Sequence, residues 1–423
     1  MAVIKPFHAI MPAQEYSSRV AALPYDVYDR EEARAAALKD PLSFLNIDRP
    51  ETQFEEGHDM YAPDVYLKAA NMLQKQEREG VFVEDPAACY YVYRLTMNGR
   101  GQTGIVACAS IDDYRNEVIR KHENTREDKL QDRIRHVDVT GMQTGPIFLA
   151  YRHNDDIAQV TERVCAGQPM FDFVSEDGIG HQGWRIDDAA DLETIRAAFE
   201  TMDRIYIADG HHRAESAVRA GLMRRDRHPS CTGEEEFNFF LSVLFPDDEL
   251  MIMDYNRVVH DLAGMELEDL LARLRQVCTM RACTITDAPA KKGEFQIYVN
   301  GQWYLAQFRT DGEAHGEAAA AATGEADPVA ALDVSVLQNR ILAPMFGIED
   351  PKTDERIEFV GGIRGSEELE KRADKWGGIA FRMYPTSIGE LMEVADAGAL
   401  MPPKSTWFEP KLRSGLFLHR IGQ

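Results

Sequence analysis

The most constraining feature of the sequence is a short polar segment, residues 209–213, between an apolar run and an amphipathic stretch. Residues 204–208 form a short apolar run typical of a buried strand. Residues 212–220 place alanine and valine at helical spacing, and Gly221 is predicted to end that helix. A chain that passes from a strand into a helix within one turn favours a glycine, here Gly210. The sequence therefore predicts a strand, a sharp turn and a helix in succession.

The turn itself carries the strongest candidate site, Asp209-Gly210-His211-His212-Arg213. The first N–H groups of a helix lack intrahelical acceptors and lie at the positive end of its dipole, so they attract anions. His211, His212 and Arg213 add side-chain donors, which predicts a phosphate held by backbone and cationic groups together. In the alternative interpretation, Asp209 caps the helix, Arg213 pairs with a surface carboxylate and the histidines have no role. Zinc is a weaker interpretation, because adjacent histidines lack the i, i+4 spacing of a helical zinc pair.

A second candidate is the charged loop 119–125 with the helix that follows it. His122 and Glu123 lie just before the predicted helix, where a glutamate can act as a general base toward a substrate hydroxyl. Lys129 and Arg133 are four residues apart and share one helical face. The alternative is a solvated, charge-rich helix. The charged loop 119–125, taken together with the turn 209–213, favours a functional site.

A third candidate lies near the carboxyl end, in Lys404-Ser405-Thr406 and in Lys411. A lysine followed by hydroxyl groups resembles part of a phosphate-binding loop. The glycines that a Walker-type loop needs are missing upstream, which excludes that loop. We expect a tail that packs its apolar side chains and points Lys404 at the site, and a purely structural tail is the alternative.

Composition limits the class of protein. The 423 residues are 44% hydrophobic and 28% charged, which is typical of a soluble globular protein with two or three domains. The six cysteines include no CxxC pair, which favours a reducing compartment. The amino-terminal residues resemble neither a signal peptide nor a membrane span, so we expect a cytoplasmic protein without a membrane partner. A net charge of −24 disfavours nucleic acid, whereas a local cluster of cations can still bind a nucleotide.

We expect an α+β fold, with a small mixed-sheet core and additions at both ends. The predicted regions are an N-terminal α/β region at 1–110, a core with the phosphate-binding motif at 111–235, and a C-terminal α/β region at 236–423 with a flexible insertion at 311–327. The predicted helices are 30–39, 64–79, 126–142, 188–200 and 267–276, and the predicted strands are 89–96, 104–111, 146–151, 239–245 and 296–308. The first two strands are expected to form a hairpin around Asn98-Gly99.

The segment Ile207–Arg213 resembles the nucleotide-binding members of the ParB/sulfiredoxin superfamily, which carry a strand, Asp-Gly-His-His-Arg and a helix. More fully, the chain looks like a widespread domain-of-unknown-function family often labelled ParB-like. The other segments that carry this likeness are Leu23–Val27, His122–Thr125 with Lys129, Asp132 and Arg133, Pro146–Phe148, and Met401–Leu416. The resemblance implies a ParB/sulfiredoxin-like mixed-sheet core with N- and C-terminal embellishments.

The functional lead in that superfamily is free serine kinase, which is similar in its His-Glu pair upstream of Asp-Gly-His-His-Arg. The resemblance implies a Mg²⁺-dependent kinase that uses ADP or ATP to phosphorylate free L-serine or a similar small hydroxylated metabolite. It makes Glu123 the general base, with His122 beside it, and assigns Asp209 to substrate or magnesium. The phosphate- and nucleotide-binding candidates are Gly210, His211, His212, Arg213, Lys129, Arg133, Lys404, Ser405, Thr406 and Lys411. This chain differs from that kinase in its long additions at both ends.

Two other functions stay open. A ParB-like nucleotide-binding regulator with a DNA or protein partner would need a basic helix-turn-helix. Residues 222–228 are basic but short, and the acidic residues 234–236 follow them. A nucleotide hydrolase or phosphatase would use the same phosphate cradle with water as the attacking group. We expect a nucleotide and a small molecule as partners, and a homo-oligomer is compatible with the sequence.

Overall fold

The structure, a computed structural model, describes residues 1–125, 127–309 and 327–422. The flexible insertion predicted at 311–327 lies outside these ranges except for its last residue. The side chain of Lys129 also lies outside the described part. Within the described ranges, no helix combines the length and the apolar character that a bilayer span requires.

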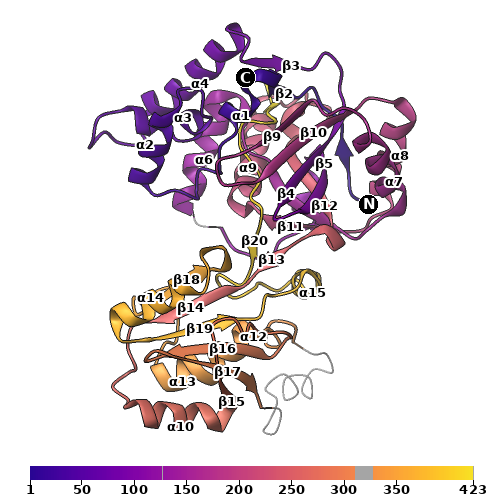
Figure 1. Cartoon of the computed structure of the whole chain (residues 1–423). Coiled ribbons are helices and arrows are strands. Elements are labelled where there is room, and N and C mark those ends of the chain that lie inside the picture. The colour runs from indigo at the N-terminus through magenta and orange to yellow at the C-terminus, as the bar shows by residue number, and fades with distance from the viewer. Residues whose placement is uncertain (126, 310–326, 423) are drawn as a thin grey trace. The chain divides into compact units, whose positions relative to one another are not determined.

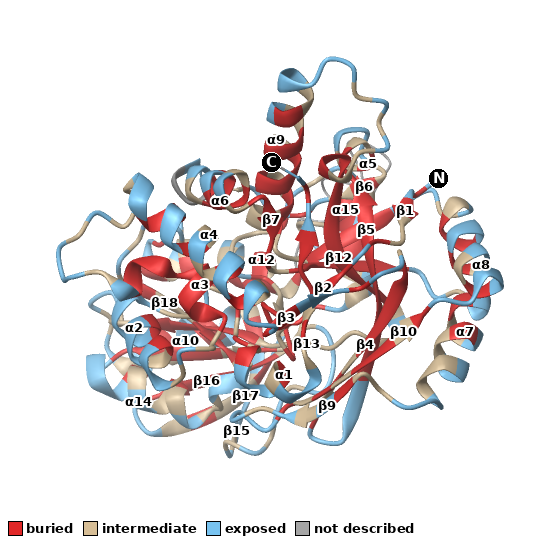
Figure 2. Cartoon of the chain, turned by 90° about the horizontal axis from the view of Figure 1, so that it is seen from above, coloured by how far each residue is buried: buried red, intermediate tan, exposed pale blue. Residues whose placement is uncertain are grey.

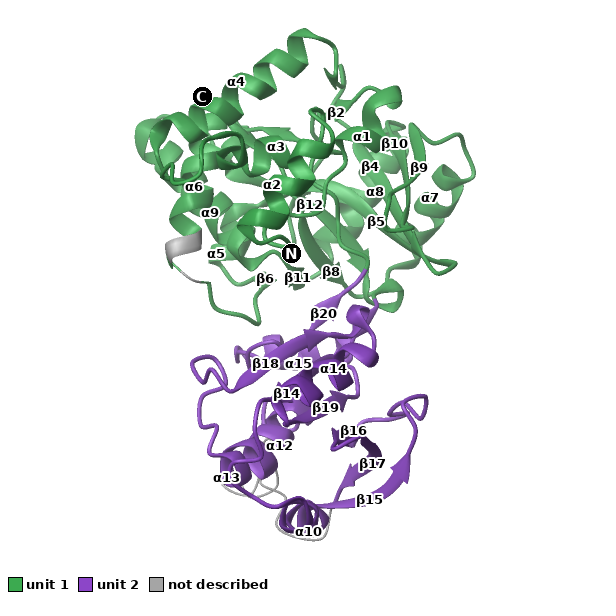
Figure 3. Cartoon of the chain, turned by 60° about the vertical axis from the view of Figure 1, so that its left-hand side comes forward, with its two compact units in different colours: residues 1–250, 410–423 green, residues 251–409 purple. Residues whose placement is uncertain are grey.

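The chain divides into two compact units, which Figure 3 shows in different colours. The first unit comprises residues 1–250 and 410–423, and the second comprises residues 251–409. The sequence predicts a finer division of the chain into three regions, with boundaries near residues 110 and 235. That division stays a prediction.

The first unit is built on a mixed sheet of nine strands (Figure 1). The strands follow the order β6-β11-β8-β12-β5-β4-β10-β9, and β1 pairs with β5. Only the pairs β11–β6 and β12–β8 are parallel. The strands are β1 (Ile4–Lys5), β4 (Tyr90–Met97), β5 (Arg100–Ser110), β6 (Ile119–Arg120), β8 (Ile147–Tyr151), β9 (Phe171–Val174), β10 (Gly180–Ile186), β11 (Ile205–Asp209) and β12 (Phe239–Pro246).

Helices and short strand pairs complete the first unit. The helices are α1 (Ser17–Val20), α2 (Arg30–Lys39), α3 (Leu45–Asp48), α4 (Pro63–Arg78), α5 (Ile111–Arg115), α6 (Glu127–Thr140), α7 (Asp155–Cys165), α8 (Ala189–Glu200) and α9 (His211–Arg227). The short strands are β2 (Ile10–Pro12) with β3 (Phe82–Glu84), and β7 (Met142–Gln143) with β21 (His419–Arg420). In Figure 2 the central strands are buried along their length, whereas α2, α7 and α8 expose one side. This pattern is expected for strands covered by amphipathic helices.

The core of the first unit joins the sheet to three helices. Strands β8 and β11 contribute Leu149 and Ile207, and helices α7, α8 and α9 contribute Ile157, Phe199 and Val218 to the same cluster. All five side chains are almost completely shielded from solvent. Because β11 and the start of α9 both belong to this core, the turn between them has a fixed position.

The C-terminal tail returns to the first unit and binds along it. Ser414 forms a β-bridge with Ala22, and Leu418 forms one with Ile10. Strand β21 then pairs antiparallel with β7. The yellow tail in Figure 1 therefore packs among elements from the first third of the chain. This arrangement brings the last residues of the sequence close to the start of β8.

The second unit has its own six-stranded antiparallel sheet and its own core. The strand order is β15-β17-β16-β19-β14-β18, and a separate pair joins β13 to β20. The elements are β13 (Ile252–Met253), β14 (Tyr255–Val259), α10 (Leu267–Val277), β15 (Cys278–Cys283), β16 (Glu294–Val299), β17 (Gln302–Phe308), α12 (Asp333–Leu337), α13 (Ala343–Phe346), β18 (Ile357–Gly361), α14 (Glu367–Trp376), β19 (Ile379–Met383), α15 (Ile388–Asp396) and β20 (Trp407–Phe408).

Most of the predicted elements are present within about two residues of their expected ends, and the mixed sheet confirms a mixed α/β architecture. The sheet is not the small core that the sequence predicts, because nine strands join in it. The predicted hairpin is β4–β5, and Asn98 and Gly99 both have the positive φ of a tight turn. The predicted helix end at Gly221 is wrong, because α9 continues to Arg227. A Cβ at Gly221 would lie 2.3 Å from the backbone oxygen of Phe237, so this glycine permits a close approach rather than a helix end. The ParB/sulfiredoxin likeness of the fold stays a prediction.

Candidate functional site

The candidate site lies where β11 passes into α9. Asp209 is the last residue of β11, Gly210 is the N-cap, and α9 begins at His211. Gly210 has φ 89° and ψ 33°, a left-handed conformation that glycine adopts at little cost. A Cβ there would also lie 3.1 Å from three guanidinium atoms of Arg213. The first turn of α9 holds no acidic residue, so the positive end of its dipole has no compensating charge of its own.

Two cations converge on the carboxylate of Asp209. Lys411 Nζ lies 3.3 Å from Asp209 Oδ2, and Arg213 Nη2 lies 3.8 Å from the same oxygen. Arg213 Nη1 also donates a hydrogen bond of 2.6 Å to the backbone oxygen of Pro146. Burial opposes the ionisation of Asp209, but Lys411 and Arg213 outweigh burial and hold its pKa well below the usual range. The three side chains together retain one positive charge in excess, at the positive end of a helix.

A pair of buried histidines lies beside this turn. The rings of His122 and His211 meet edge to face with centroids 4.5 Å apart, and the residues are 3% and 5% exposed. Burial lowers the pKa of His122 to about 4, and burial together with His122 lowers the pKa of His211 well below its ordinary value. Both rings are therefore neutral at pH 7. Within the described residues, His122 Nδ1 and His211 Nε2 have no hydrogen-bond partner.

Glu123 and His212 complete the turn region. The Oε2 atom of Glu123 lies 3.9 Å from His211 Nδ1, and about half of the Glu123 side chain is exposed. His212 is partly exposed in the first turn of α9. The loop 119–125 and the turn 209–213, which are far apart in the sequence, thus lie together because β6 pairs parallel with β11. The predicted roles of these residues in catalysis and phosphate binding stay predictions.

Arg133 is held by protein groups. Its Nη2 lies 2.7 Å from Asp132 Oδ2, and its Nη1 donates a hydrogen bond of 3.1 Å to the backbone oxygen of Asp48. Its guanidinium carbon lies 4.2 Å from the centre of the Tyr25 ring. These contacts use donors on all three guanidinium nitrogens, since Nε also bonds to Asp132. Arg133 is therefore bonded to other protein groups at each guanidinium nitrogen. A phosphate would have to compete with Asp132 for the Arg133 guanidinium.

Of the carboxy-terminal candidates, Lys411 belongs to the first unit and Lys404, Ser405 and Thr406 belong to the second. The backbone oxygen of Lys404 accepts a hydrogen bond of 3.1 Å from Arg257. The hydroxyl of Ser405 donates to the backbone oxygen of Pro402 at 2.7 Å. These contacts are internal to the second unit, and a role of the three residues in phosphate binding stays a prediction.

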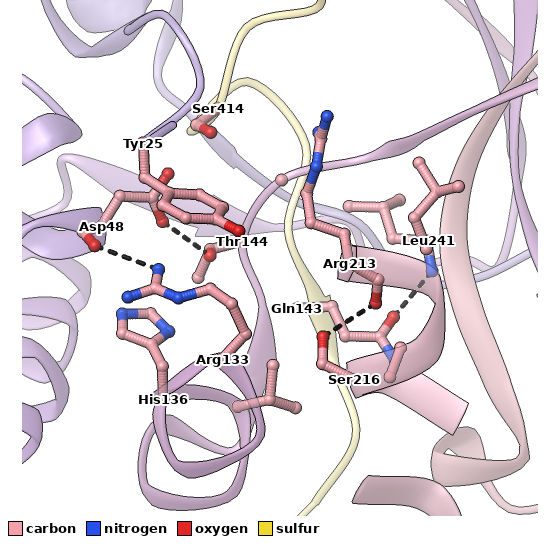
Figure 4. A pocket seen from close by; sticks show the side chains of 14 residues that line it. Tyr25, Asp48, Arg133, His136, Gln143, Thr144, Arg213, Ser216, Leu241 and Ser414 are labelled. Atoms are coloured by element: carbon pink, nitrogen blue, oxygen red, sulfur yellow. Dashed lines mark hydrogen bonds between the residues drawn. The ribbon is translucent and has the colours of Figure 1, made fainter. Parts of the chain in front are cut away.

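A cavity opens on another side of Arg213 (Figure 4). Its volume is about 40 Å³. The polar residues that line it are Tyr25, Asp48, Arg133, His136, Gln143, Thr144, Arg213, Ser216 and Ser414. Sequence reasoning missed Asp48, Thr144 and Ser414 as neighbours of Arg213. No local pattern marks them, because they come from α3, from the loop before β8 and from the tail.

The described residues contain no group of three or more His, Cys, Asp or Glu side chains that could hold a metal ion by themselves. A magnesium ion that arrives with a nucleotide needs only one or two protein carboxylates, because phosphate oxygens and water supply its other ligands. Asp209 is the carboxylate at the start of α9, and its lowered pKa keeps it ionised. It is therefore the residue that fits this role.

Fold and site together define a mixed α/β protein with a cationic strand–turn–helix element at one end of its large sheet. The chain belongs to the family described as "Protein of unknown function (DUF1015)", whose sequence profile matches residues 4–335. No curated protein matches the chain.

Three solved structures illustrate the structural similarity. A free serine kinase in complex with AMP shares 15% identity, with 74% of this chain and 91% of that chain covered and a TM-score of 0.31. A conserved hypothetical protein from Pyrococcus furiosus shares 15% identity, with 75% and 95% covered and a TM-score of 0.32. SbnI with a C-terminal truncation, from Staphylococcus aureus, shares 12% identity, with 74% and 87% covered and a TM-score of 0.35.

Proposed function

We propose that this protein is a nucleotide-dependent phosphotransferase that moves a phosphoryl group from ADP or ATP to the hydroxyl of a small metabolite, with free L-serine as the first candidate. The observation that carries the proposal is the convergence of Arg213 and Lys411 on Asp209 at the glycine-opened start of α9. Helix N–H groups and paired cations are the donors that bind phosphate oxygens in proteins.

In the proposed reaction, the acceptor oxygen forms a bond to phosphorus and the bond from that phosphorus to the bridging oxygen of the nucleotide breaks. AMP leaves if ADP is the donor, and ADP leaves if ATP is the donor. The N–H groups at the start of α9, Arg213 and Lys411 would stabilise the charge on the transferred group. Bound with the nucleotide, Mg²⁺ would neutralise further phosphate charge, with Asp209 as its protein ligand.

Glu123 is the proposed general base that takes the hydroxyl proton of the acceptor. Its carboxylate lies at the same end of α9 as Arg213 and is half exposed, so a substrate can reach it. The neutral rings of His211 and His122 pack behind it. A neutral imidazole beside the base leaves its negative charge available for proton transfer, whereas a charged imidazole would reduce its basicity.

The alternative of a regulator that binds DNA receives no support from the basic end of α9. Arg224 and Arg227 pair with Asp138, and Arg225 pairs with Asp112. A DNA-binding surface needs cations that can exchange small counterions for phosphates. Hydrolysis of the nucleotide remains the competing activity, because the half-exposed Glu123 could also activate water.

The test is to incubate the protein with ADP or ATP, Mg²⁺ and L-serine, and to follow phosphoserine and free phosphate by ³¹P NMR. We expect phosphoserine to accumulate, and we expect Glu123→Gln to abolish turnover while nucleotide affinity is kept. Glu127→Gln is the matched control, because Glu127 is an exposed carboxylate engaged by Arg219. Free phosphate alone would replace the kinase with a hydrolase, and an active Glu123→Gln variant would remove Glu123 from the mechanism.

A further inference from the structure

The cavity beside Arg213 has the size of a small metabolite. One buried water needs roughly 10–15 Å³ of such space and occupies about 30 Å³ of liquid. The cavity, at about 40 Å³, therefore holds roughly three waters, or a molecule of about 90 Å³. A compound of about six or seven non-hydrogen atoms fits this space, whereas a nucleoside does not. Any ligand of this cavity is thus distinct from the nucleotide.

The wall opposite Arg213 in Figure 4 carries a buried carboxylate, Asp48. Asp48 is 3% exposed, and its Oδ1 accepts a hydrogen bond of 2.8 Å from the hydroxyl of Thr144. It forms no ion pair with any residue that the structure describes. The nearby guanidinium of Arg133 is paired instead with Asp132. The Arg133 guanidinium attracts the Asp48 carboxylate without forming an ion pair with it. A cationic ligand group bonded directly to Asp48 would stabilise this buried charge further.

Besides Asp48, the polar lining of the cavity consists of Arg213, Arg133, whose charge is paired with Asp132, the side chains of His136 and Gln143, and the hydroxyls of Tyr25, Thr144, Ser216 and Ser414. Tyr25 and Ser414 line the space between the two charged walls. Arg213 also contacts Asp209 on its other side, where the phosphoryl group is proposed to bind. One residue therefore connects the cavity with the proposed phosphate site.

We infer that this cavity is the acceptor subsite, and that it takes a small hydroxylated primary amine with its ammonium group at Asp48 and its hydroxyl toward Arg213. The role of the cavity as an acceptor subsite rests on the proposed phosphotransferase function. Its selectivity for an amine does not depend on that function. An acceptor with a carboxylate, such as L-serine, would receive hydrogen bonds from the hydroxyls of Tyr25 and Ser414. A hydroxy acid without an amine would leave Asp48 without its cationic partner.

The test is calorimetric binding of L-serine, ethanolamine and D-glycerate to the full chain, without nucleotide. We expect L-serine and ethanolamine to bind, with D-glycerate at least about tenfold weaker, because a hydrogen bond between charged groups is worth about one to two powers of ten in affinity. In Asp48→Asn the affinity for both amines should fall by about tenfold or more, while D-glycerate should bind equally well or more tightly, because the variant removes a negative charge from the cavity wall. Asp113→Asn is the matched control, since Asp113 is also buried and accepts a hydrogen bond from a neutral donor, Val3 N.

A second variant keeps the inference testable if Asp48→Asn does not fold. Ala217→Leu adds volume to the α9 wall of the cavity, where Ala217 is 4% exposed. It should abolish amine binding and leave ADP binding intact. Equal amine affinity in the wild type and Asp48→Asn, or unchanged amine binding in Ala217→Leu, would overturn the subsite. Amine binding that depends on Asp48 in a protein without transferase activity would instead preserve the subsite and refute the kinase.

Discussion

Lys411 Nζ lies 3.3 Å from Asp209 Oδ2, although 202 positions separate the two residues in the sequence. Asp209 is fixed at the end of β11, and Lys411 is carried by the C-terminal tail. The tail reaches this place because the bridge between Ser414 and Ala22 holds it along the first unit. A site that begins as a local strand–turn–helix motif thus gains a second cation from the far end of the chain.

Replacement of Lys411 by methionine should weaken nucleotide binding without unfolding the protein. The change keeps the length of the side chain and removes one of the two cations at Asp209, while Arg213 remains. A charge-assisted hydrogen bond is worth about 1.5–3 kcal/mol, so we expect the Kd for ADP to rise about tenfold or more. Isothermal titration calorimetry measures this. Lys39→Met is the control, because the exposed Lys39 pairs with the exposed Glu176 at 3.6 Å, far from the site in the sequence. An equal loss in both variants would contradict the role of Lys411.

The local part of the site could be predicted from the sequence, and the non-local part could not. The strand ending in Asp209 and the helix beginning at His211 follow from hydrophobic pattern and from Gly210, which all act over a few residues. Thr144 and Asp48 are in contact although they are 96 positions apart, and no sequence pattern in either segment predicts this contact. Such contacts depend on which elements pack together, which the sequence pattern leaves open.

The same limit explains the one wrong helix end. The sequence predicts that α9 ends at Gly221, because glycine is common just after a helix. In the structure this glycine lies inside α9 and faces the backbone of Phe237, so its missing side chain serves packing. A glycine in a helical pattern has both uses, and only tertiary structure distinguishes them.

Gly210→Ala should impair nucleotide binding more than its backbone strain explains. An alanine at φ 89° is strained, and its Cβ would lie 3.1 Å from the guanidinium of Arg213 and displace it. Gly233→Ala is the matched control, because Gly233 has φ 98° but no atom within 4 Å of a Cβ. We expect both variants to lose about 1 kcal/mol of stability or more, and only Gly210→Ala to bind ADP more weakly. Equal ADP affinity in the two variants would show that the position of Arg213 does not matter for the nucleotide.

The tail that carries Lys411 is anchored by a buried arginine. Arg413 is 3% exposed, forms an ion pair with Asp177, and donates to Ser175 Oγ at 3.2 Å and to His181 Nε2 at 3.3 Å. The pair is buried on the arginine side only, because the Asp177 side chain is 44% exposed, so its loss costs less than the loss of a fully buried pair. We therefore expect Arg413→Ala to lower the unfolding temperature and to weaken ADP binding as Lys411→Met does, because the tail would loosen.

The smaller change Asp177→Asn separates anchoring from stability. Asp177 lies in the turn between β9 and β10, pairs with Arg413, and is partly exposed. If the anchor positions Lys411, Asp177→Asn should raise the Kd for ADP while leaving the Kd of a Lys411→Met background unchanged. Additive losses in the double variant would instead mean that the two residues act independently.

Acidification should destabilise the protein through its buried histidines, and His122 offers a direct measurement. Burial lowers the pKa of His122 to about 4, against an ordinary value of about 6.5 in the unfolded chain. Between these values the unfolded chain binds a proton that the folded protein does not, so stability is full above pH 6.5 and falls as the pH drops toward 4. From pH 7.5 to pH 5, His122 alone should remove about 2 kcal/mol of unfolding free energy. In His122→Asn that part of the loss should disappear, as measured by urea unfolding at the two pH values.

His153→Asn is the control with the opposite sign, because a hydrogen bond to Asp248 raises the pKa of the exposed His153. Replacing His153 should therefore not reduce the loss of unfolding free energy at low pH. An unchanged pH dependence in His122→Asn would mean that the folded protein protonates this ring as readily as the unfolded chain does, and burial would then not lower the pKa of His122.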